Sequence, residues 1–344
     1  MRLSLYASLP EEIAARLGLE KAYRGRQIFE GLHKRGLDFE SMTDLPASLR
    51  DKLASEIPQF TTKVVQTLRD PDGTVKLRIA AEGEEENPVF IECVLLETDT
   101  GRKTACLSTQ AGCAMGCAFC KTGTLGLHRN LEAAEIMEQF HHLARGCGAI
   151  SNIVFMGMGE PLENLAALRK VIAVFTHPGG LALSPRRLTV STCGVVPGIL
   201  SLADEGPSVG IAVSLVSADE EKRKTLMPAA RKWGLEELKK ALLYHQEKTG
   251  KRLTVEIVVL KGINDGREDI RKLRGYLNGL DAIVNLIPWN PAPGLDFQEA
   301  PESAIQLYYT ELEGAGIPAV RRYRRGRKIG GACGQLGGGW EPPS

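Results

Sequence analysis

From about residue 104 onwards, short apolar runs alternate with amphipathic stretches, and this rhythm limits the possible folds more than any other feature of the sequence. The runs are apolar at nearly every position, as expected of strands that are buried on both faces of a parallel sheet. They lie at residues 104–109, 152–159, 188–194, 209–216, 253–260 and 282–289. Stretches of helical period lie between and after them, at 131–145, 163–176, 197–205, 235–249, 267–279 and 302–315. These units predict an α/β fold, a partial (β/α)6 barrel of the TIM type.

The first 100 residues follow a different pattern. Residues 1–60 are rich in helix formers, with a helical period over 24–36 and a second candidate helix over 42–53, which predicts a small helical accessory domain. Residues 61–100 contain three strand-like runs separated by turn sequences, which predicts a short β segment. We therefore expect four parts, namely 1–60, 61–100, a barrel over 101–316, and a basic strand and glycine-rich loop over 317–344.

Composition excludes several classes of protein. The chain has 344 residues, of which 43% are hydrophobic and 25% charged, with a net charge of +1. These are ordinary globular values, unlike those of disordered, collagen-like or coiled-coil chains. No apolar run approaches the roughly 20 residues that a membrane helix needs, and the first residues lack the apolar stretch of a signal peptide. We expect a cytoplasmic protein without a membrane partner.

Three of the eight cysteines lie within eight residues, as Cys113, Cys117 and Cys120 in a C-x3-C-x2-C pattern. Thiolates are soft ligands that favour iron–sulfur clusters or zinc. A structural zinc ion normally takes a fourth ligand, and the nearby His128 has the spacing of no common zinc finger. The pattern fits a [4Fe–4S] cluster with one iron left open. A zinc site and three cysteines buried by chance are the alternatives.

This motif follows the first strand of a partial barrel, and it resembles that of the radical S-adenosylmethionine (SAM) superfamily. The segment GMGEP at 157–161 resembles the glycine-rich segment of that family, which meets the amino group of SAM. Further stretches resemble the RlmN/Cfr family of RNA adenosine methyltransferases, with NLIPWNP closer to the RlmN side. They are RGRQIFEGLHKRG with SMTDLP, CLSTQAGCAMGCAFCKTGTLGLHRNL, FMGMGEPLEN, LSPRRLTVSTCGVVPGI, and NLIPWNP with ACGQL, and together they run from residue 24 to residue 336.

The resemblance implies a methyltransferase that acts on a ring carbon of one adenosine in 23S rRNA, with tRNA as a second candidate substrate and C2 as the favoured position. It implies a [4Fe–4S] cluster held by the three clustered cysteines, two SAM molecules per turnover and an electron donor such as flavodoxin. By the same resemblance, the residues that contact SAM are Gly159, Glu160, Ser191, Ser214, Leu215, Val216 and Asn290. We also expect a monomer.

Two further cysteines and one glutamate have catalytic roles in the resembling family. Cys333, in ACGQL, would carry the methyl group as S-methylcysteine, and Cys106 would release the product by forming a transient disulfide with it. Glu92 would accept the ring proton, although an exposed residue on an alternating strand is the alternative reading. A lone cysteine is most often a small buried hydrophobe, and this is our prediction for Cys147 and Cys193 and for the remaining Cys93.

The sequence departs from the family at two places. The family usually has Ser-Leu-His where this chain has Ser214-Leu215-Val216, and it usually has an acidic stretch before the carrier cysteine where this chain has Gly326–Ala332. The run 321–328 instead holds six cations in eight residues, and phosphate contacts of such cations supply much of the affinity for RNA. Further basic residues that could contact RNA are Arg24, Arg26, Lys34, Arg35, Arg186, Arg187 and those at 222–224.

Three rival hypotheses stay open at this point. The first is C8 methylation or a different RNA. The second is a radical SAM enzyme that acts on a small molecule, which would not need Cys333. The third is a zinc or RNA-binding module without enzymatic activity.

Overall fold

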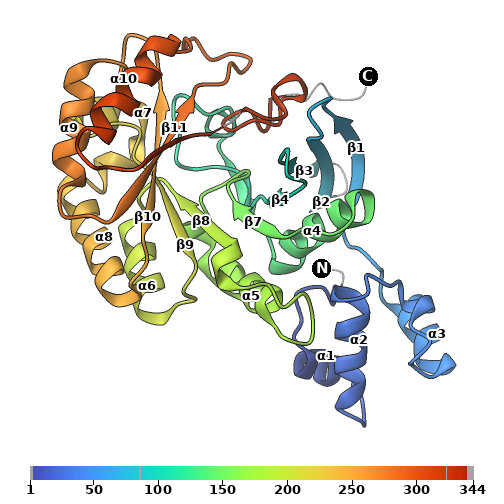
Figure 1. Cartoon of the computed structure of the whole chain (residues 1–344). Coiled ribbons are helices and arrows are strands. Elements are labelled where there is room, and N and C mark those ends of the chain that lie inside the picture. Colours follow the sequence, from blue (N-terminus) through green and yellow to red (C-terminus); the bar gives the residue numbers. More distant parts are fainter. Residues whose placement is uncertain (1–2, 85–86, 323, 339–344) are drawn as a thin grey trace.

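The computed structural model describes residues 3–84, 87–322 and 324–338, and these form one large sheet with helices packed outside it (Figure 1). The ten strands lie in the order β1-β2-β3-β4-β7-β8-β9-β10-β11-β12. From β4 onwards neighbouring strands are parallel, whereas β1 to β4 pair antiparallel. Their bounds are β1 Lys63–Arg69, β2 Val75–Glu84, β3 Asn87–Glu97, β4 Lys103–Cys106, β7 Asn152–Phe155, β8 Leu188–Thr192, β9 Gly210–Ser214, β10 Leu253–Val259, β11 Ala282–Pro288 and β12 Ala319–Arg321.

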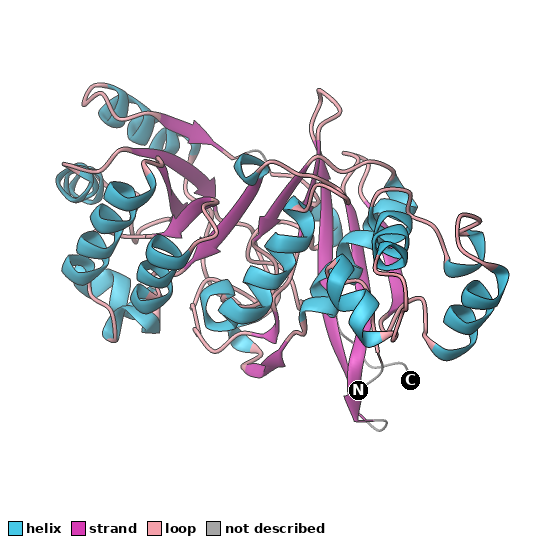
Figure 2. Cartoon of the chain, turned by 90° about the horizontal axis from the view of Figure 1, so that it is seen from below, coloured by secondary structure: helices cyan, strands magenta, loops and turns pink. Residues whose placement is uncertain are grey.

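Helices follow the parallel strands and cover the convex face of the sheet, which curves around the site as an open barrel (Figures 1 and 2). They are α4 Ala133–Cys147, α5 Leu165–Thr176, α6 Val196–Glu205, α7 Glu220–Leu226, α8 Leu235–Thr249, α9 Arg267–Leu277 and α10 Glu302–Glu313. All but the short α7 lie where helical periodicity predicted a helix. The expected partial α/β barrel is therefore confirmed, and the predicted β segment extends its sheet as β1 to β3.

A small hairpin lies apart from the large sheet, and the sequence did not predict it. Its strands are β5 (Gln110–Gly112) and β6 (Leu127–Asn130), which pair antiparallel. Such short strands carry too few residues to show a period of two. The hairpin encloses the C-x3-C-x2-C loop, so its pairing brings the two ends of that loop together.

The amino-terminal part consists of α1 (Pro10–Arg16), α2 (Tyr23–His33) and α3 (Ala47–Glu56). The first two helices pack so closely that a Cβ on Gly25 would lie 2.1 Å from the carbonyl oxygen of Pro10, so only glycine fits there. The helix expected over 42–53 begins later, at Ala47, because Pro46 has extended backbone angles at its N-cap. None of the helices in the described part of the chain is long and apolar enough to cross a membrane.

A fully buried carboxylate joins this amino-terminal part to the barrel. Glu138 on α4 accepts hydrogen bonds from the Ser4 hydroxyl at 2.8 Å, from the backbone N–H of Thr62 at 2.8 Å and from the Thr62 hydroxyl at 2.7 Å. The backbone N–H and the hydroxyl of Thr61 donate to it as well. A buried charge is tolerated only when its lone pairs are satisfied in this way, so Glu138 fixes the chain that leads into β1.

Two buried imidazoles form another contact between these parts. His33 Nδ1 lies 3.1 Å from His141 Nε2, and the Tyr6 ring packs against His141 with 4.4 Å between ring centroids. Burial lowers the pKa of His33 to about 3 and also lowers the pKa of His141. Both side chains are therefore neutral in the folded protein at neutral pH.

This pair predicts that acid destabilises the protein. Below the ordinary histidine pKa of 6.5, the unfolded chain takes up protons that the folded chain does not, so stability present above pH 6.5 is lost as the pH falls. The loss should be about 1.4 kcal/mol per histidine for each pH unit well below that value. Urea unfolding at pH 7.5 and pH 5.5 would measure it. His33→Gln should flatten the slope, and an unchanged slope would contradict this account.

Candidate functional site

The candidate site lies at the carboxyl ends of the parallel strands, where parallel α/β folds place their active sites. The loop between β5 and β6 holds the three clustered cysteines there. Cys113 N–H donates to Gly126 O at 2.7 Å, Ala118 N–H to Leu226 O at 2.9 Å, and the Trp289 indole N–H to Phe119 O at 3.0 Å. The loop is therefore fixed at both ends and in the middle.

The three thiols fit a cluster better than a single metal ion. Cys113, Cys117 and Cys120 line one cavity. Burial raises the pKa of Cys113 to about 12 and also raises the pKa values of Cys117 and Cys120, so a bound cation would be needed to keep them as thiolates. A structural zinc ion normally takes four protein ligands, whereas a [4Fe–4S] cluster takes each cysteine on a separate iron. Three cysteines of one loop at one cavity could hold such a cluster.

Most of the residues predicted to contact SAM line the same cavity as the cysteines. These are Gly159, Glu160, Ser191, Ser214 and Asn290. The Asn290 amide donates to the Cys333 carbonyl oxygen at 3.1 Å, whereas its own carbonyl oxygen is buried and has no partner in the described part of the chain. A buried acceptor of this kind needs a donor, which the amino group or a hydroxyl of a bound ligand such as SAM would provide.

Leu215 and Val216 do not line this cavity. Both are buried, and their backbone N–H groups donate to Glu256 O at 3.1 and 3.2 Å. The Val216 carbonyl oxygen accepts from the Asn264 amide at 2.8 Å. Because these polar groups are bound within the sheet edge, the structure does not bring either residue to the predicted SAM contacts.

The GMGEP segment turns sharply beside the cavity. Gly159 has a φ of +100°, and a Cβ there would lie 2.5 Å from the Cβ of Gln110, so glycine is required. The Glu160 carboxylate accepts from Cys193 N–H at 2.8 Å and from Leu162 N–H at 3.1 Å, and burial raises its pKa. Cys193, predicted to be a packing residue, also lines the cavity beside Glu160.

A second cavity of about 700 Å³ meets the first one at Cys333. Cys106 lines this second cavity, and Cys333, Asn290, Met156 and Arg322 line both. Its other cationic side chains are Arg102, Arg187, Arg321, Arg324 and Arg325. Its volume is typical of ligand sites, and its charge suits an anionic ligand. The fold thus brings Cys106 and Cys333 together although they lie far apart in the sequence.

Arg322, which is partly buried, forms an ion pair with the buried Glu256 between the two cavities, and the sequence did not single this pair out. Its guanidinium donates to Glu256 Oε1 at 3.0 Å and contacts Met156 Sδ at 3.2 Å. The neighbouring Cys333, Glu256 and Cys106 raise the pKa of Arg322. The available signal was Glu256, a lone carboxylate within the apolar run LTVEIVVL.

The loop that carries Cys333 is bound on both sides by its backbone. On one side, Lys121 N–H donates to Gly334 O and the Thr122 hydroxyl donates to Leu336 O, both at 2.8 Å. On the other side, the Lys76 ammonium donates to Gly330 O at 3.3 Å and Gly337 N–H donates to Glu92 Oε2 at 2.9 Å. Bonds to the cluster loop and to β2 and β3 therefore fix Cys333 between them.

Glu92 and Lys76 bind the Cys333 loop from the side of β2 and β3, and we call this pair of residues the clamp. The Glu92 side chain is buried and pairs with Lys76 at 3.3 Å, so the alternative of an exposed strand residue is wrong. It does not line either of the two cavities at Cys333. The structure thus brings Glu92 to the loop of Cys333, outside the lining of both cavities.

The basic run before Cys333 is largely neutralised by acidic side chains. Arg321 pairs with Glu302 at 2.6 Å, Arg325 with Asp99 at 2.6 Å, and Arg324 with Glu299. Elsewhere, Arg223 is buried and donates to backbone carbonyls, and Lys222 pairs with Asp269. Exposed pairs of this kind are weak, so a phosphate could replace the carboxylates at 321–325, whereas Arg223 is structural.

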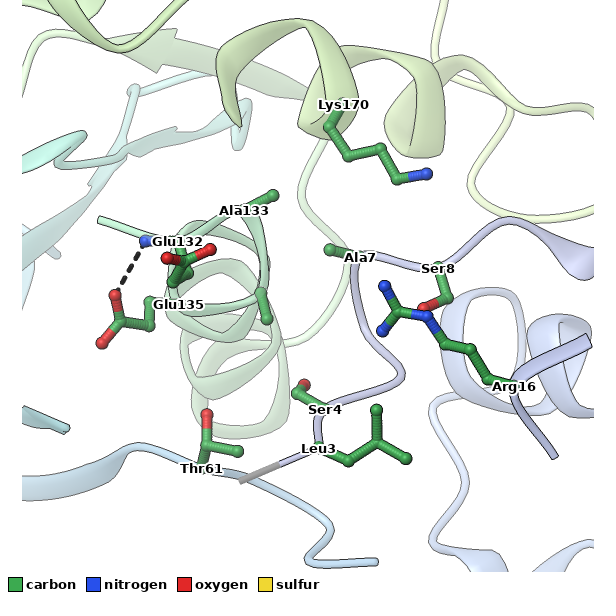
Figure 3. Close-up of a pocket in the computed structure, with 11 residues that line it drawn as sticks. Leu3, Ser4, Ala7, Ser8, Arg16, Thr61, Glu132, Ala133, Glu135 and Lys170 are labelled. Atoms are coloured by element: carbon green, nitrogen blue, oxygen red, sulfur yellow. Dashed lines mark hydrogen bonds between the residues drawn. The ribbon is translucent and has the colours of Figure 1, made fainter. Parts of the chain in front are cut away.

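Another cavity, of about 260 Å³, lies between the amino-terminal part and the barrel (Figure 3). Arg16, Lys170 and Ser8 line it. None of the predicted site residues does, so it is separate from the candidate site.

Comparisons with known proteins show the family to which the chain is related. Residues 107–274 match the radical SAM superfamily, and residues 11–57 match the ribosomal RNA large subunit methyltransferase N-terminal domain. The chain is 45% identical to a probable dual-specificity RNA methyltransferase RlmN of Treponema pallidum, over 97% of both chains. It is 46% identical to a protein of the same name from Moorella thermoacetica, again over 97% of each.

One solved structure is similar over nearly the whole length. It is the crystal structure of a radical SAM methyltransferase from Sphaerobacter thermophilus, with a TM-score of 0.92 and 38% sequence identity, covering 98% of this chain and 100% of that chain. The similarity extends over the amino-terminal helices, the barrel and the carboxyl-terminal loop together.

The clamp on the carrier loop gives a prediction. Lys76→Met should leave the buried Glu92 without its counter-charge, a change that typically costs about 3–5 kcal/mol. Amide hydrogen exchange should then become at least about tenfold faster, equivalent to about 1.4 kcal/mol of local stability, in peptides covering 330–337. Lys63→Met, at an exposed position on β1, is the control. Unchanged exchange in Lys76→Met would show that the clamp does not hold the loop.

Proposed function

Because the chain belongs to the RlmN family of radical SAM RNA methyltransferases, as its motifs predicted, we propose that it methylates a ring carbon of one adenosine through S-methylated Cys333. C2 is the favoured carbon, 23S rRNA the favoured substrate and tRNA a second substrate. The observation that carries the proposal is the position of Cys333, where the cavity of the cluster cysteines meets the arginine-lined cavity. A thiol at that junction can face both a methyl donor and an RNA base.

Cys113, Cys117 and Cys120 would hold the [4Fe–4S] cluster, and Gly159, Glu160, Ser191, Ser214 and Asn290 would contact SAM. When bound, these groups supply the methyl group and the radical chemistry that an unreactive aromatic C–H bond requires. Cys333 would receive its methyl group from one SAM molecule and would be activated at the expense of a second one in each turnover. The chain itself orients Cys333 and keeps the first cavity narrow.

Cys333 and Cys106 divide the work of covalent catalysis. Cys333 would carry the methyl group and, once one hydrogen atom has been removed from that group, would bond through its methylene carbon to the adenosine ring. Cys106 then attacks the Cys333 sulfur, which releases the methylated base and leaves a disulfide that must be reduced before the next turnover. Their common cavity and their mutual electrostatic influence support this pairing.

Glu92 is the proposed acceptor of the ring proton, and its place behind the carrier loop gives it a second role. The Lys76 ammonium pairs with one of its oxygens and Gly337 N–H binds the other. A shift of the carrier loop would expose this carboxylate to the cavity. Glu92 would therefore hold the loop before the reaction and accept the proton during it.

The second cavity is the proposed site of the target nucleotide. A base must leave its stack to reach Cys333, which favours a loop or another unpaired region of RNA. Arg102 and Arg187, with Arg321, Arg324 and Arg325, would contact the phosphates on either side. A monomeric state, a cytoplasmic location and a flavodoxin-like electron donor remain predictions from the sequence.

The carrier role predicts the mass of one peptide. Protein produced with a cluster-loading system should contain a Cys333 peptide heavier by one CH2 unit, because the thiol has accepted a methyl group in the cell. Cys333→Ala should make no methyladenosine at all. Full turnover by that variant would favour a small-molecule radical enzyme, and RNA mapping with and without the protein would distinguish C2 from C8.

The proton-acceptor role predicts a different defect. Glu92→Gln keeps an oxygen for Gly337 N–H but is a poor base, so product formation should fall by about 10²–10⁴-fold while Cys333 is still methylated. Glu92→Ala should also loosen the loop, as seen by hydrogen exchange. Normal turnover of Glu92→Gln would exclude Glu92 as the proton acceptor and leave it only the role of holding the Cys333 loop.

A further inference from the structure

Cys106 faces a chemical problem in its proposed role. A thiolate is the nucleophile in disulfide formation, yet burial raises the pKa of the Cys106 thiol to about 12. Cys333 and Glu256 act in the same direction, whereas Arg322 and a backbone hydrogen bond at Met156 lower the pKa. Cys93 lies behind it on β3. Cys106 belongs to an apolar cluster with Val94, Met158 and Leu336, against which Leu96, Val154 and Met156 pack.

Arg322 is the cation among these neighbours, and it is held in place. Its backbone N–H donates to Leu286 O at 3.0 Å, and its guanidinium is fixed between Glu256 Oε1 and Met156 Sδ. Glu256 is buried and also accepts weakly from Ser214 and Asn285. The Glu256 carboxylate therefore accepts from three side chains. The Arg322 guanidinium keeps further N–H donors that these contacts do not use. The neighbouring Arg321, Arg324 and Arg325 pair with the more exposed carboxylates of Glu302, Glu299 and Asp99, whereas the carboxylate of Glu256 is buried.

We propose that Arg322 is a positioning residue for the release step, because its fixed guanidinium stabilises Cys106 as a thiolate when Cys106 attacks the Cys333 sulfur. The inference rests on the role of Cys106 proposed above. It adds the cation that allows a buried thiol to react as a thiolate. Arg322 lies at the junction of the two cavities, so it is near both sulfurs during the attack. The ion pair with Glu256 orients the Arg322 guanidinium and leaves some of its N–H donors free of these contacts.

The release step forms one sulfur–sulfur bond and breaks one sulfur–carbon bond. The Cys106 thiolate forms a bond to the Cys333 sulfur, and the bond from that sulfur to the methylene carbon on the adenine breaks. The electron pair of the broken bond goes to the carbon, which then takes up a proton and becomes the methyl group. Each sulfur is oxidised by one electron and the carbon is reduced by two, so no further oxidant is needed.

The test uses the loaded enzyme with its RNA substrate in a single turnover. Arg322→Gln should still methylate Cys333 but should retain the covalent protein–RNA adduct, which decays at least about tenfold more slowly at pH 7.5, as a thiol pKa raised by one unit would give. Its rate should recover at higher pH. Arg322→Lys should restore part of the rate, and Arg252→Gln, a surface arginine paired with Asp281, is the control.

A second measurement separates this inference from the proposed function. Iodoacetamide labelling of Cys106 against pH, read on its peptide without RNA, should shift to higher pH in Arg322→Gln. The inference holds only if labelling and adduct decay change together. A change in one alone, or loss of Cys333 methylation, would overturn it. Cys106→Ala should trap the adduct at every pH, and failure to do so would show that the role of Cys106 itself is wrong.

Discussion

The backbone hydrogen bonds of the Cys333 loop determine where the two cavities meet. Its carbonyl groups accept from Lys121, Thr122 and Lys76, and Gly337 N–H donates to Glu92. These partners belong to the cluster loop and to β2 and β3, far from the loop in sequence. Each such bond contributes only about 0.5–1.5 kcal/mol, so the loop is well defined and can still be moved. The proposed methyl carrier must face first a methyl donor and then a base, so its loop must be well defined and must also be able to move.

Charge is the second constraint on the site. Burial raises the pKa of the Cys106 thiol and of the cluster cysteines. The ion pair of Arg322 with Glu256 places a cation between the two cavities, and a preorganised charge in a dry site acts more strongly than it would in water. Carboxylates pair with the neighbouring arginines, so RNA phosphates would exchange with these carboxylates rather than meet bare cations.

The sequence predicted the barrel because long elements show their period. The helices α5 and α8 lie almost where the pattern placed them, whereas β5 and β6 are too short to have one. Among the predicted SAM contacts, Leu215 and Val216 are directed into the sheet edge by hydrogen bonds to Glu256 and Asn264. That arrangement depends on tertiary contacts that no spacing reveals.

The roles of Arg322 and Lys76 were not predicted, because they too depend on tertiary contacts. Arg322 was one cation in a basic run, and only the fold shows that its partner is a buried carboxylate, whereas its neighbours pair with more exposed ones. Lys76 and Glu92 lie on adjacent strands, and their pairing depends on the register of β2 and β3. The three cysteines of the cluster motif, in contrast, lie on one loop, so their spacing and the family resemblance were enough to predict a cluster without knowledge of the fold.

The central claim is that the methyl group passes through Cys333 where the two cavities meet. The most direct measurement is the deuterium content of the product methyl after Cys333 has been methylated with a fully deuterated methyl donor. The account predicts that this methyl appears on adenosine with two deuterium atoms and one hydrogen, because one deuterium is abstracted on the carrier and a proton is added on release. A product methyl that keeps all three deuterium atoms would show direct transfer and contradict the account.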